Sequence, residues 1–175
     1  MVKKIKQKKT RKISAAMDLA MSYQQTGHLP EAENLYRKIL KEQPNNSQPY
    51  VNLGFILRSR GQIDEAITCY KKALALNPYQ ADVYNDLGSA LQAKGQIDEA
   101  IIHYLKTLEI NPNHATAFYN LGSAYQLKGR IEEAIVYYRK AAEYLPSAML
   151  YNNLATALTQ KGQLDEAISH YKTAL

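Results

Sequence analysis

Apolar residues recur at helical spacing along this chain, in pairs of short segments separated by a glycine. Residues 81–114 show the pattern most clearly, with one apolar stripe before Gly95 and a second one after it. Spacings of three and four residues place such side chains on one face of a helix, so each segment is predicted to be an amphipathic helix. The two stripes are Val83, Tyr84, Leu87 and Leu91, and then Ile97, Ala100, Ile101, Tyr104 and Leu108.

The helix pair is repeated along almost the whole chain. Glycines equivalent to Gly95 occur at positions 27, 61, 129 and 162, so that successive steps are 34, 34, 34 and 33 residues. A fixed period of this length is typical of repeat architectures, in which each unit packs against its neighbours. We therefore predict an all-α solenoid over residues 13–175, with repeats at 13–46, 47–80, 81–114, 115–147 and 148–175, the last one incomplete.

Turn and contact residues support this assignment. Gly95 is expected to end the first helix in the left-handed conformation, and Pro112 prevents the second helix from continuing. Small residues recur where helices must approach closely. They are Ala20, Gly54, Gly88, Gly122 and Ala155 in the first helices, and Ala32, Ala66, Ala100, Ala134 and Ala167 in the second helices.

These residues resemble the tetratricopeptide repeat (TPR). The second repeat has the family pattern as Tyr50, Leu53, Gly54, Gly61, Ala66, Tyr70, Ala73 and Pro78. The resemblance implies a right-handed superhelix of antiparallel helix pairs, whose first helices line a concave groove that binds peptide segments of other proteins. The repeats are also similar to those of O-linked N-acetylglucosamine transferases and of bacterial arrays linked to glycosyltransferases.

The charge of the chain is concentrated in its first residues. Residues 1–12 contain seven of the 22 basic residues and no acidic residue, which leaves the remainder close to neutral. Such a segment has little apolar surface to bury, so we predict a basic, disordered tail over 1–12, and a weak contact of this tail with anionic polymers or membranes. One cysteine, Cys69, and no apolar run of membrane-spanning length favour a cytoplasmic location.

No catalytic constellation is recognisable, and we expect no cofactor and no metal site. His103 and His170 occupy the same repeat position two repeats apart, too far to share a metal, and Cys69 lies in that column without a base beside it. The Asp-Glu pairs at 64/65, 98/99 and 165/166 lie in first helical turns, where the helix dipole favours acids, so a structural role is preferred to acid/base catalysis.

A second stripe on the first helices is the candidate binding surface. Asparagine or aspartate recurs at Asp18, Asn52, Asp86, Asn120 and Asn153, and Met21, Phe55 and Ser89 follow three residues after the first three of these. An amide column can hydrogen-bond the backbone of an extended peptide, with Tyr119 as an aromatic platform beside it. The alternative is that these side chains bond only between neighbouring repeats.

The sequence leaves two functions open. One is a non-catalytic scaffold that binds a protein or peptide partner in the groove. The other is the substrate-recruiting region of a larger enzyme, most plausibly a glycosyltransferase. Apolar residues on the last helix also predict self-association through the C-terminal end, because such patches mark contacts: Leu164, Ala167, Ile168 and Tyr171.

Overall fold

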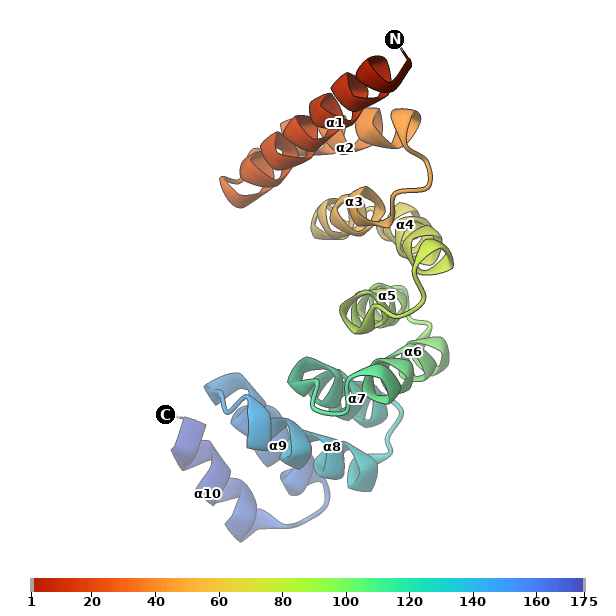
Figure 1. Ribbon diagram of the computed structural model, residues 1–175. Helices are drawn as coiled ribbons and strands as arrows, with labels where there is room; N and C mark the ends of the chain where they lie inside the picture. The colour runs from red at the N-terminus through yellow and green to blue at the C-terminus, as the bar shows by residue number, and fades with distance from the viewer. Residues whose placement is uncertain (1, 175) are drawn as a thin grey trace. The chain divides into compact units, whose positions relative to one another are not determined.

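The computed structural model describes the backbone of residues 2–174 and the side chains of residues 11–174. This part of the chain contains ten α-helices and no strand, joined by short connections (Figure 1). The all-α solenoid predicted from the sequence is confirmed. The helices are α1 (Val2–Gln25), α2 (Leu29–Glu42), α3 (Ser47–Ser59), α4 (Ile63–Leu76), α5 (Ala81–Ala93), α6 (Ile97–Ile110), α7 (Ala115–Leu127), α8 (Ile131–Tyr144), α9 (Ala148–Gln160) and α10 (Leu164–Ala174).

The chain divides into two compact units, residues 1–78 and 79–175. In the first unit, α1 packs on α2, α2 on α3 and α3 on α4. In the second unit, each helix from α5 to α10 packs on the next one, and the first helices of its three repeats also contact one another, α5 with α7 and α7 with α9. Each unit is therefore a stack of helix pairs, and in the second unit the first helices also form one face.

The repeat glycines end the first helices as the sequence predicts. Gly95 has a φ of +83°, and the amide of Gln96 donates back to the carbonyl oxygen of Leu91 at 2.9 Å. This left-handed residue closes the helix and turns the chain into the second helix of the pair. The other four repeat glycines, at positions 27, 61, 129 and 162, share the positive φ.

The small residues in the first helices make room for a buried tyrosine in the second. A Cβ atom added to Gly88 would lie 2.6 Å from the ring of Tyr104, and the same geometry holds for Gly54 with Tyr70 and for Gly122 with Tyr138. These rings are almost fully buried. Their hydroxyl groups therefore lie inside the stack, whereas the residue type alone would also fit a ring at its edge.

The single shortened repeat loses its residue in a connection. Residues 145–147 join α8 to α9, whereas residues 77–80 and 111–114 make the equivalent connections earlier in the chain. A connection absorbs such a deletion without rotating the apolar face of either helix.

The first residues of the chain differ from the expectation. The helix α1 begins at Val2, so residues 2–12 have helical backbone in the structure instead of irregular backbone. Lysine, glutamine and arginine are good helix formers, and they continue the helical register of α1 towards the N-terminus. The side chains of residues 1–10 lie outside the described residues, so the proposed role of the tail stays a prediction.

Candidate interaction surfaces

The first helices of the second unit are linked by asparagine side chains. The Nδ2 atom of Asn120 on α7 donates to Oδ1 of Asn85 on α5 at 2.9 Å and lies 3.3 Å from Oγ of Ser89. One repeat further on, Nδ2 of Asn153 on α9 donates to the hydroxyl oxygen of Tyr119 at 2.8 Å. The amide nitrogens of this column therefore connect neighbouring repeats.

A second row of polar contacts runs beside the first. The hydroxyl of Tyr104 donates to Oε1 of Gln92 at 3.0 Å, and Nε2 of Gln92 donates to Ser123 of the next repeat at 3.1 Å. In the next repeat the hydroxyl of Tyr138 donates to Oε1 of Gln126 at 2.9 Å. Burial raises the pKa of Tyr138, so its hydroxyl keeps its proton and acts as this donor.

Sequence reasoning missed this glutamine row, although a signal was available. Glutamine occurs at positions 24, 92 and 126, each twelve residues before a buried tyrosine. A buried hydroxyl needs a hydrogen-bond partner, so a recurring amide at a fixed distance from a recurring tyrosine predicts the pair. The row fixes the tyrosine ring and also holds one repeat to the next.

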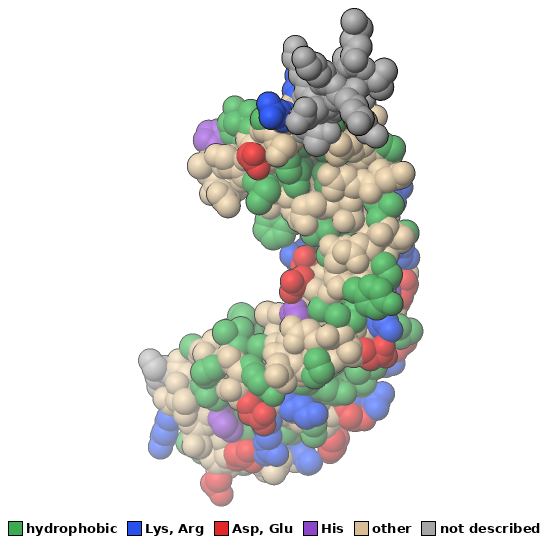
Figure 2. All heavy atoms as spheres, in the orientation of Figure 1, with side chains coloured by type: hydrophobic (Ala, Val, Ile, Leu, Met, Phe, Trp, Pro, Cys, Tyr) green, Lys and Arg blue, Asp and Glu red, His purple; other side chains and the backbone are tan. Residues whose placement is uncertain are grey.

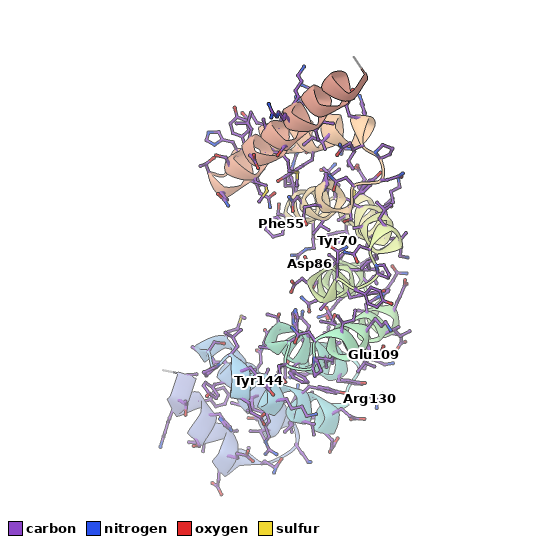
Figure 3. The ribbon with its side chains drawn as sticks, viewed as in Figure 1. Phe55, Tyr70, Asp86, Glu109, Arg130 and Tyr144 are labelled. Atoms are coloured by element: carbon purple, nitrogen blue, oxygen red, sulfur yellow. The ribbon has the colours of Figure 1, made fainter. Side chains whose placement is uncertain are left out.

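In the first unit, the positions equivalent to Asn120 and Ser89 carry the amide of Asn52 and two apolar side chains, Met21 and Phe55. Nδ2 of Asn52 donates to the hydroxyl of Tyr36 at 3.0 Å, and that hydroxyl donates to Gln24 at 2.9 Å. Met21 and Phe55 are each 42% exposed, a large fraction for apolar side chains of this size. Phe55 projects from α3 on the side away from α4 (Figure 3), with the guanidinium of Arg58 6.0 Å from its ring centre.

Comparison with known proteins identifies the repeats. Residues 79–147 match the tetratricopeptide repeat family, and so do 35–68 and, together, 13–41 and 147–175, while 55–95 match a TPR repeat family. A crystal structure of MamA shares 31% sequence identity with this chain at a TM-score of 0.82. The alignment covers 90% of this chain and 93% of the MamA chain. This chain belongs to the tetratricopeptide repeat family.

Other solved structures share the tetratricopeptide fold at lower identity. A MamA fragment from Desulfovibrio magneticus RS-1 is 22% identical, with a TM-score of 0.85. The alignment covers 93% of this chain and 93% of the fragment. YrrB, described as a TPR protein with an unusual peptide-binding site, is 21% identical, with a TM-score of 0.75. The alignment covers 91% of this chain and 82% of the YrrB chain. No protein with a curated description matches the sequence.

The structure divides the predicted site residues between the two units of the tetratricopeptide array. Asp18, Met21, Asn52 and Phe55 belong to the first unit, and Asp86, Ser89, Tyr119, Asn120 and Asn153 to the second. Within the second unit, Asn120 is brought to Ser89, and Asn153 is brought to Tyr119. The inter-repeat bonding left open as an alternative is therefore present, and it uses the nitrogen atoms of the three asparagines.

The acidic residues at the start of the second helices form ion pairs between tetratricopeptide repeats. Arg139 on α8 pairs with Glu166 on α10 at 2.6 Å, and Lys128 pairs with Asp98. Figure 2 shows Lys and Arg side chains interspersed with Asp and Glu over the surface of the second unit. Exposed pairs of this kind contribute little individually, but they account for the Asp-Glu motif without invoking catalysis.

Neither a metal site nor a membrane span is present in the described part of the chain. Among residues with described side chains, no three His, Cys, Asp or Glu side chains form a group that could hold a metal ion. No helix in this part of the chain is long and apolar enough to cross a membrane.

Apolar side chains remain exposed on the last tetratricopeptide helix. Leu164, Ile168 and Tyr171 of α10 are 58%, 52% and 39% exposed, respectively, whereas Ala167 is buried. The hydroxyl of Tyr171 lies 3.2 Å from Oγ1 of Thr156 on α9, so its ring is held at the edge of the last pair. This surface is available for a contact.

Proposed function

We propose that this chain is a protein-interaction scaffold whose first helices bind an extended peptide segment of a partner protein. Tetratricopeptide arrays are helical repeat proteins that use extended surfaces for binding. YrrB, a protein of the same fold, is described as having a peptide-binding site, and this supports the general assignment. The finer question is which atoms of this chain contact the peptide.

The observation that carries the proposal is the orientation of the asparagine amides in the second unit. Their nitrogens are bonded between repeats, and no described donor reaches Oδ1 of Asn120 or of Asn153. Each side chain is half-buried and fixed in position, yet keeps an oxygen free to accept a hydrogen bond. An extended peptide offers backbone N–H groups at regular intervals, and these are suitable donors.

Prior fixation of the amides favours binding. A side chain that is ordered only when a ligand arrives loses about 0.5–1.5 kcal/mol of conformational freedom at that step. Asn120 and Asn153 are already held by Ser89, Asn85 and Tyr119, so much of this cost is met on folding. The inter-repeat bonds and the peptide contacts are therefore compatible roles of the same side chains.

Sequence preference would come from the side chains that flank the amides. In the first unit, exposed Met21 and Phe55 favour an apolar residue of the partner, because methionine adapts to varied shapes. In the second unit Asp86, which points from α5 away from α6 (Figure 3), disfavours acidic residues opposite it. We therefore expect the first unit to prefer a peptide segment with an apolar residue, and the second unit to prefer a segment with few acidic residues.

The test is a peptide-array screen with the wild-type chain, followed by calorimetry on the strongest hits. Phe55→Ala should weaken binding about tenfold or more, as truncation of an exposed aromatic anchor does. Asn120→Ala with Asn153→Ala should also weaken it, with the extent of folding checked by circular dichroism. Asn34→Ala on α2 and Val136→Ala on α8, both exposed on second helices, are the matched controls.

The outcomes separate the alternatives. Loss of binding in the first-helix variants, with the second-helix controls unchanged, supports a peptide-binding site on the first helices. Equal binding by folded first-helix variants and wild type would place the partner on another face. Hits that bind equally well after scrambling of the peptide sequence would point to non-specific adsorption instead of recognition.

Two weaker contacts are proposed beside the groove. The exposed side chains of α10 are proposed to mediate self-association, since exposed apolar patches mark protein contacts. The basic segment 1–12 is proposed to bind anionic polymers or membrane surfaces through its charge.

A further inference from the structure

A stacked pair of rings joins the two helices of each of the last three repeats. In each case a ring on the first helix faces a ring nineteen residues later on the second helix. The pairs are Tyr84 with His103 (centroids 5.9 Å apart, planes at 22°), Phe118 with Tyr137 (6.4 Å, 28°) and Tyr151 with His170 (5.7 Å, 10°).

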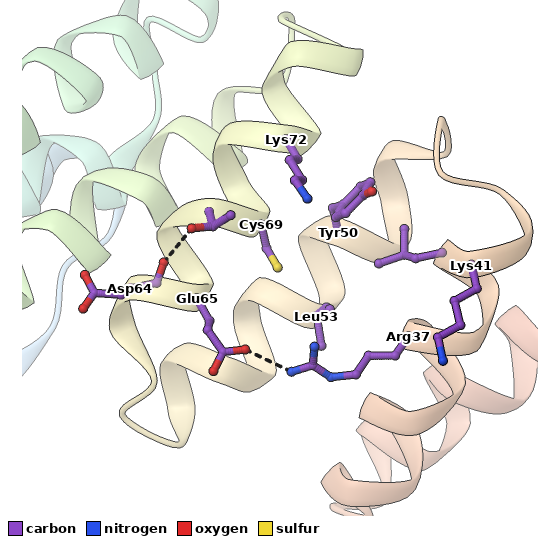
Figure 4. A pocket seen from close by; sticks show the side chains of 10 residues that line it. Arg37, Lys41, Tyr50, Leu53, Asp64, Glu65, Cys69 and Lys72 are labelled. Atoms are coloured by element: carbon purple, nitrogen blue, oxygen red, sulfur yellow. Dashed lines mark hydrogen bonds and ion pairs between the residues drawn. The ribbon is translucent and has the colours of Figure 1, made fainter.

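The second repeat keeps the first ring and lacks the other. Tyr50 on α3 occupies the position of Tyr84, but Cys69 on α4 stands where the three later repeats carry His103, Tyr137 or His170. A thiol is far smaller than an imidazole or phenol ring. A cavity of about 500 Å³ opens here in the first unit, between α2, α3 and α4, and we call it the α2–α4 crevice (Figure 4).

The crevice has an apolar floor. Leu40 of α2, Leu53 of α3 and the Cys69 thiol line it together with the face of Tyr50. Cys69 is 8% exposed, and burial raises the pKa of its thiol, so that it lies there as a neutral apolar group. Such a floor accepts a flat apolar group.

A lysine above the first ring does not exclude a second ring. Nζ of Lys72 lies 5.6 Å from the centre of the Tyr50 ring. In the fourth repeat, Nζ of Lys140 lies 5.6 Å from the centre of Phe118 and 6.0 Å from that of Tyr137, while the two rings remain stacked. The arrangement around Tyr50 is thus the same one with the second ring removed.

The rim of the crevice carries both charges, with two lysines at one end of it. Arg37 is paired with Glu33 at 2.8 Å and with Glu65 at 3.2 Å. Lys41 and Lys72, which follow this cluster on α2 and α4, form no ion pair with any carboxylate among the described residues. Asp64 also lies on the rim, about 12 Å from Lys72 along α4, so a negative ligand is favoured at the lysine end.

We propose that the α2–α4 crevice binds an aromatic side chain, flanked by acidic residues, from a segment of a partner protein. The aromatic ring stacks on Tyr50 in the position that His103, Tyr137 and His170 occupy in the later repeats. The flanking carboxylates pair with Lys41 and Lys72. This site lies between α2, α3 and α4, and none of its lining residues belongs to the groove proposed above.

The probe is the peptide acetyl-Asp-Glu-Tyr-Asp-Glu-amide, titrated into the wild-type chain at low salt and followed by calorimetry. We expect saturable binding that weakens as salt is added, because the flanking contacts are ionic. Replacement of the peptide tyrosine by alanine, or of its four acids by lysine, should weaken binding about tenfold or more.

The decisive variants are at Cys69. Cys69→His and Cys69→Tyr supply the ring that the three later repeats carry and close the crevice, so peptide binding should be lost while the thermal midpoint stays near wild type. Cys69→Ala leaves the crevice open and should bind as wild type does. Two ring-forming variants keep the test usable if one of them fails to fold.

Lysine variants test the charge. Lys41→Ala and Lys72→Ala should each weaken binding several-fold and flatten its dependence on salt. The proposal is overturned if folded Cys69→His binds the peptide as well as wild type, if the alanine peptide binds equally, or if wild type shows no saturable binding. Phe55→Ala, which affects the groove, should leave this interaction unchanged, so that the two proposals fail separately.

Discussion

Replacement of Gly88 by alanine sets two effects of similar size against each other. Alanine in place of glycine inside a helix gains about 1 kcal/mol of helix propensity. Against this, the new Cβ would lie 2.6 Å from Cε1 and 2.7 Å from Cδ1 of Tyr104. Carbon atoms in favourable contact lie about 3.5–4.0 Å apart, so the ring or the helix must move by roughly 1 Å.

The surroundings of the ring decide which effect prevails. Tyr104 is almost fully buried, and its hydroxyl is bonded to Gln92 at 3.0 Å. Overpacking of a close-packed site costs about 1–3 kcal/mol. The first repeat sets a limit to this cost, because it carries buried Ala20 at the position equivalent to Gly88 and an equally buried Tyr36 at that of Tyr104. We therefore expect a net destabilisation of about 1 kcal/mol after the propensity gain.

Thermal melts followed by circular dichroism provide the measurement. A loss of about 1 kcal/mol lowers the midpoint by roughly 2–4 °C in a chain of this size. The same substitution in a Tyr104→Leu background is the control, because without the ring the propensity gain should appear and alanine should stabilise. A higher midpoint for Gly88→Ala in the wild-type background would refute the reasoning that the ring fills the space above Gly88.

Three further outcomes follow from particular side chains. Removal of residues 1–12 should leave the melting midpoint nearly unchanged and abolish binding to heparin in low salt; a lower midpoint would mean that the segment packs on the array. Ile168→Glu should reduce self-association in sedimentation experiments at high concentration, whereas unaltered self-association would exclude the α10 surface. Alkylation of Cys69 should rise only at a higher pH than for a free thiol, because burial raises its pKa and the reaction needs the thiolate; an ordinary profile would contradict its burial.

The fold was predictable because its signals repeat. Gly95 and its equivalents mark every turn, and a single residue of this type in one copy would have carried far less weight. The close contact of Gly88 with a neighbour was also predictable, since glycine inside a helix costs stability and needs a packing reason. The helical backbone of residues 2–12 was missed because burial was weighed and local propensity was not.

The interaction surfaces were only partly predictable. The sequence places Asn120 on the proposed binding surface of a first helix, but asparagine has both donors and acceptors, and residue type does not say which are used within the protein. The sequence shows that Cys69 occupies a column that carries a ring in each of the three later repeats. Its meaning depends on the stacking of Tyr84 on His103 and of Phe118 on Tyr137, which requires coordinates.

Asn120 connects the stability of the array with its proposed binding role. Its amide nitrogen reaches Asn85 at 2.9 Å and Ser89 at 3.3 Å, and each net hydrogen bond is worth about 0.5–1.5 kcal/mol. Asn120→Ala should therefore cost about 1–2 kcal/mol, and a double-mutant cycle with Asn85→Ala should give a coupling energy of about 0.5–1 kcal/mol. Urea unfolding of the four variants measures it. If the coupling is zero, the amide is not held by its neighbour in solution, and the argument that the peptide meets an already ordered acceptor loses its basis.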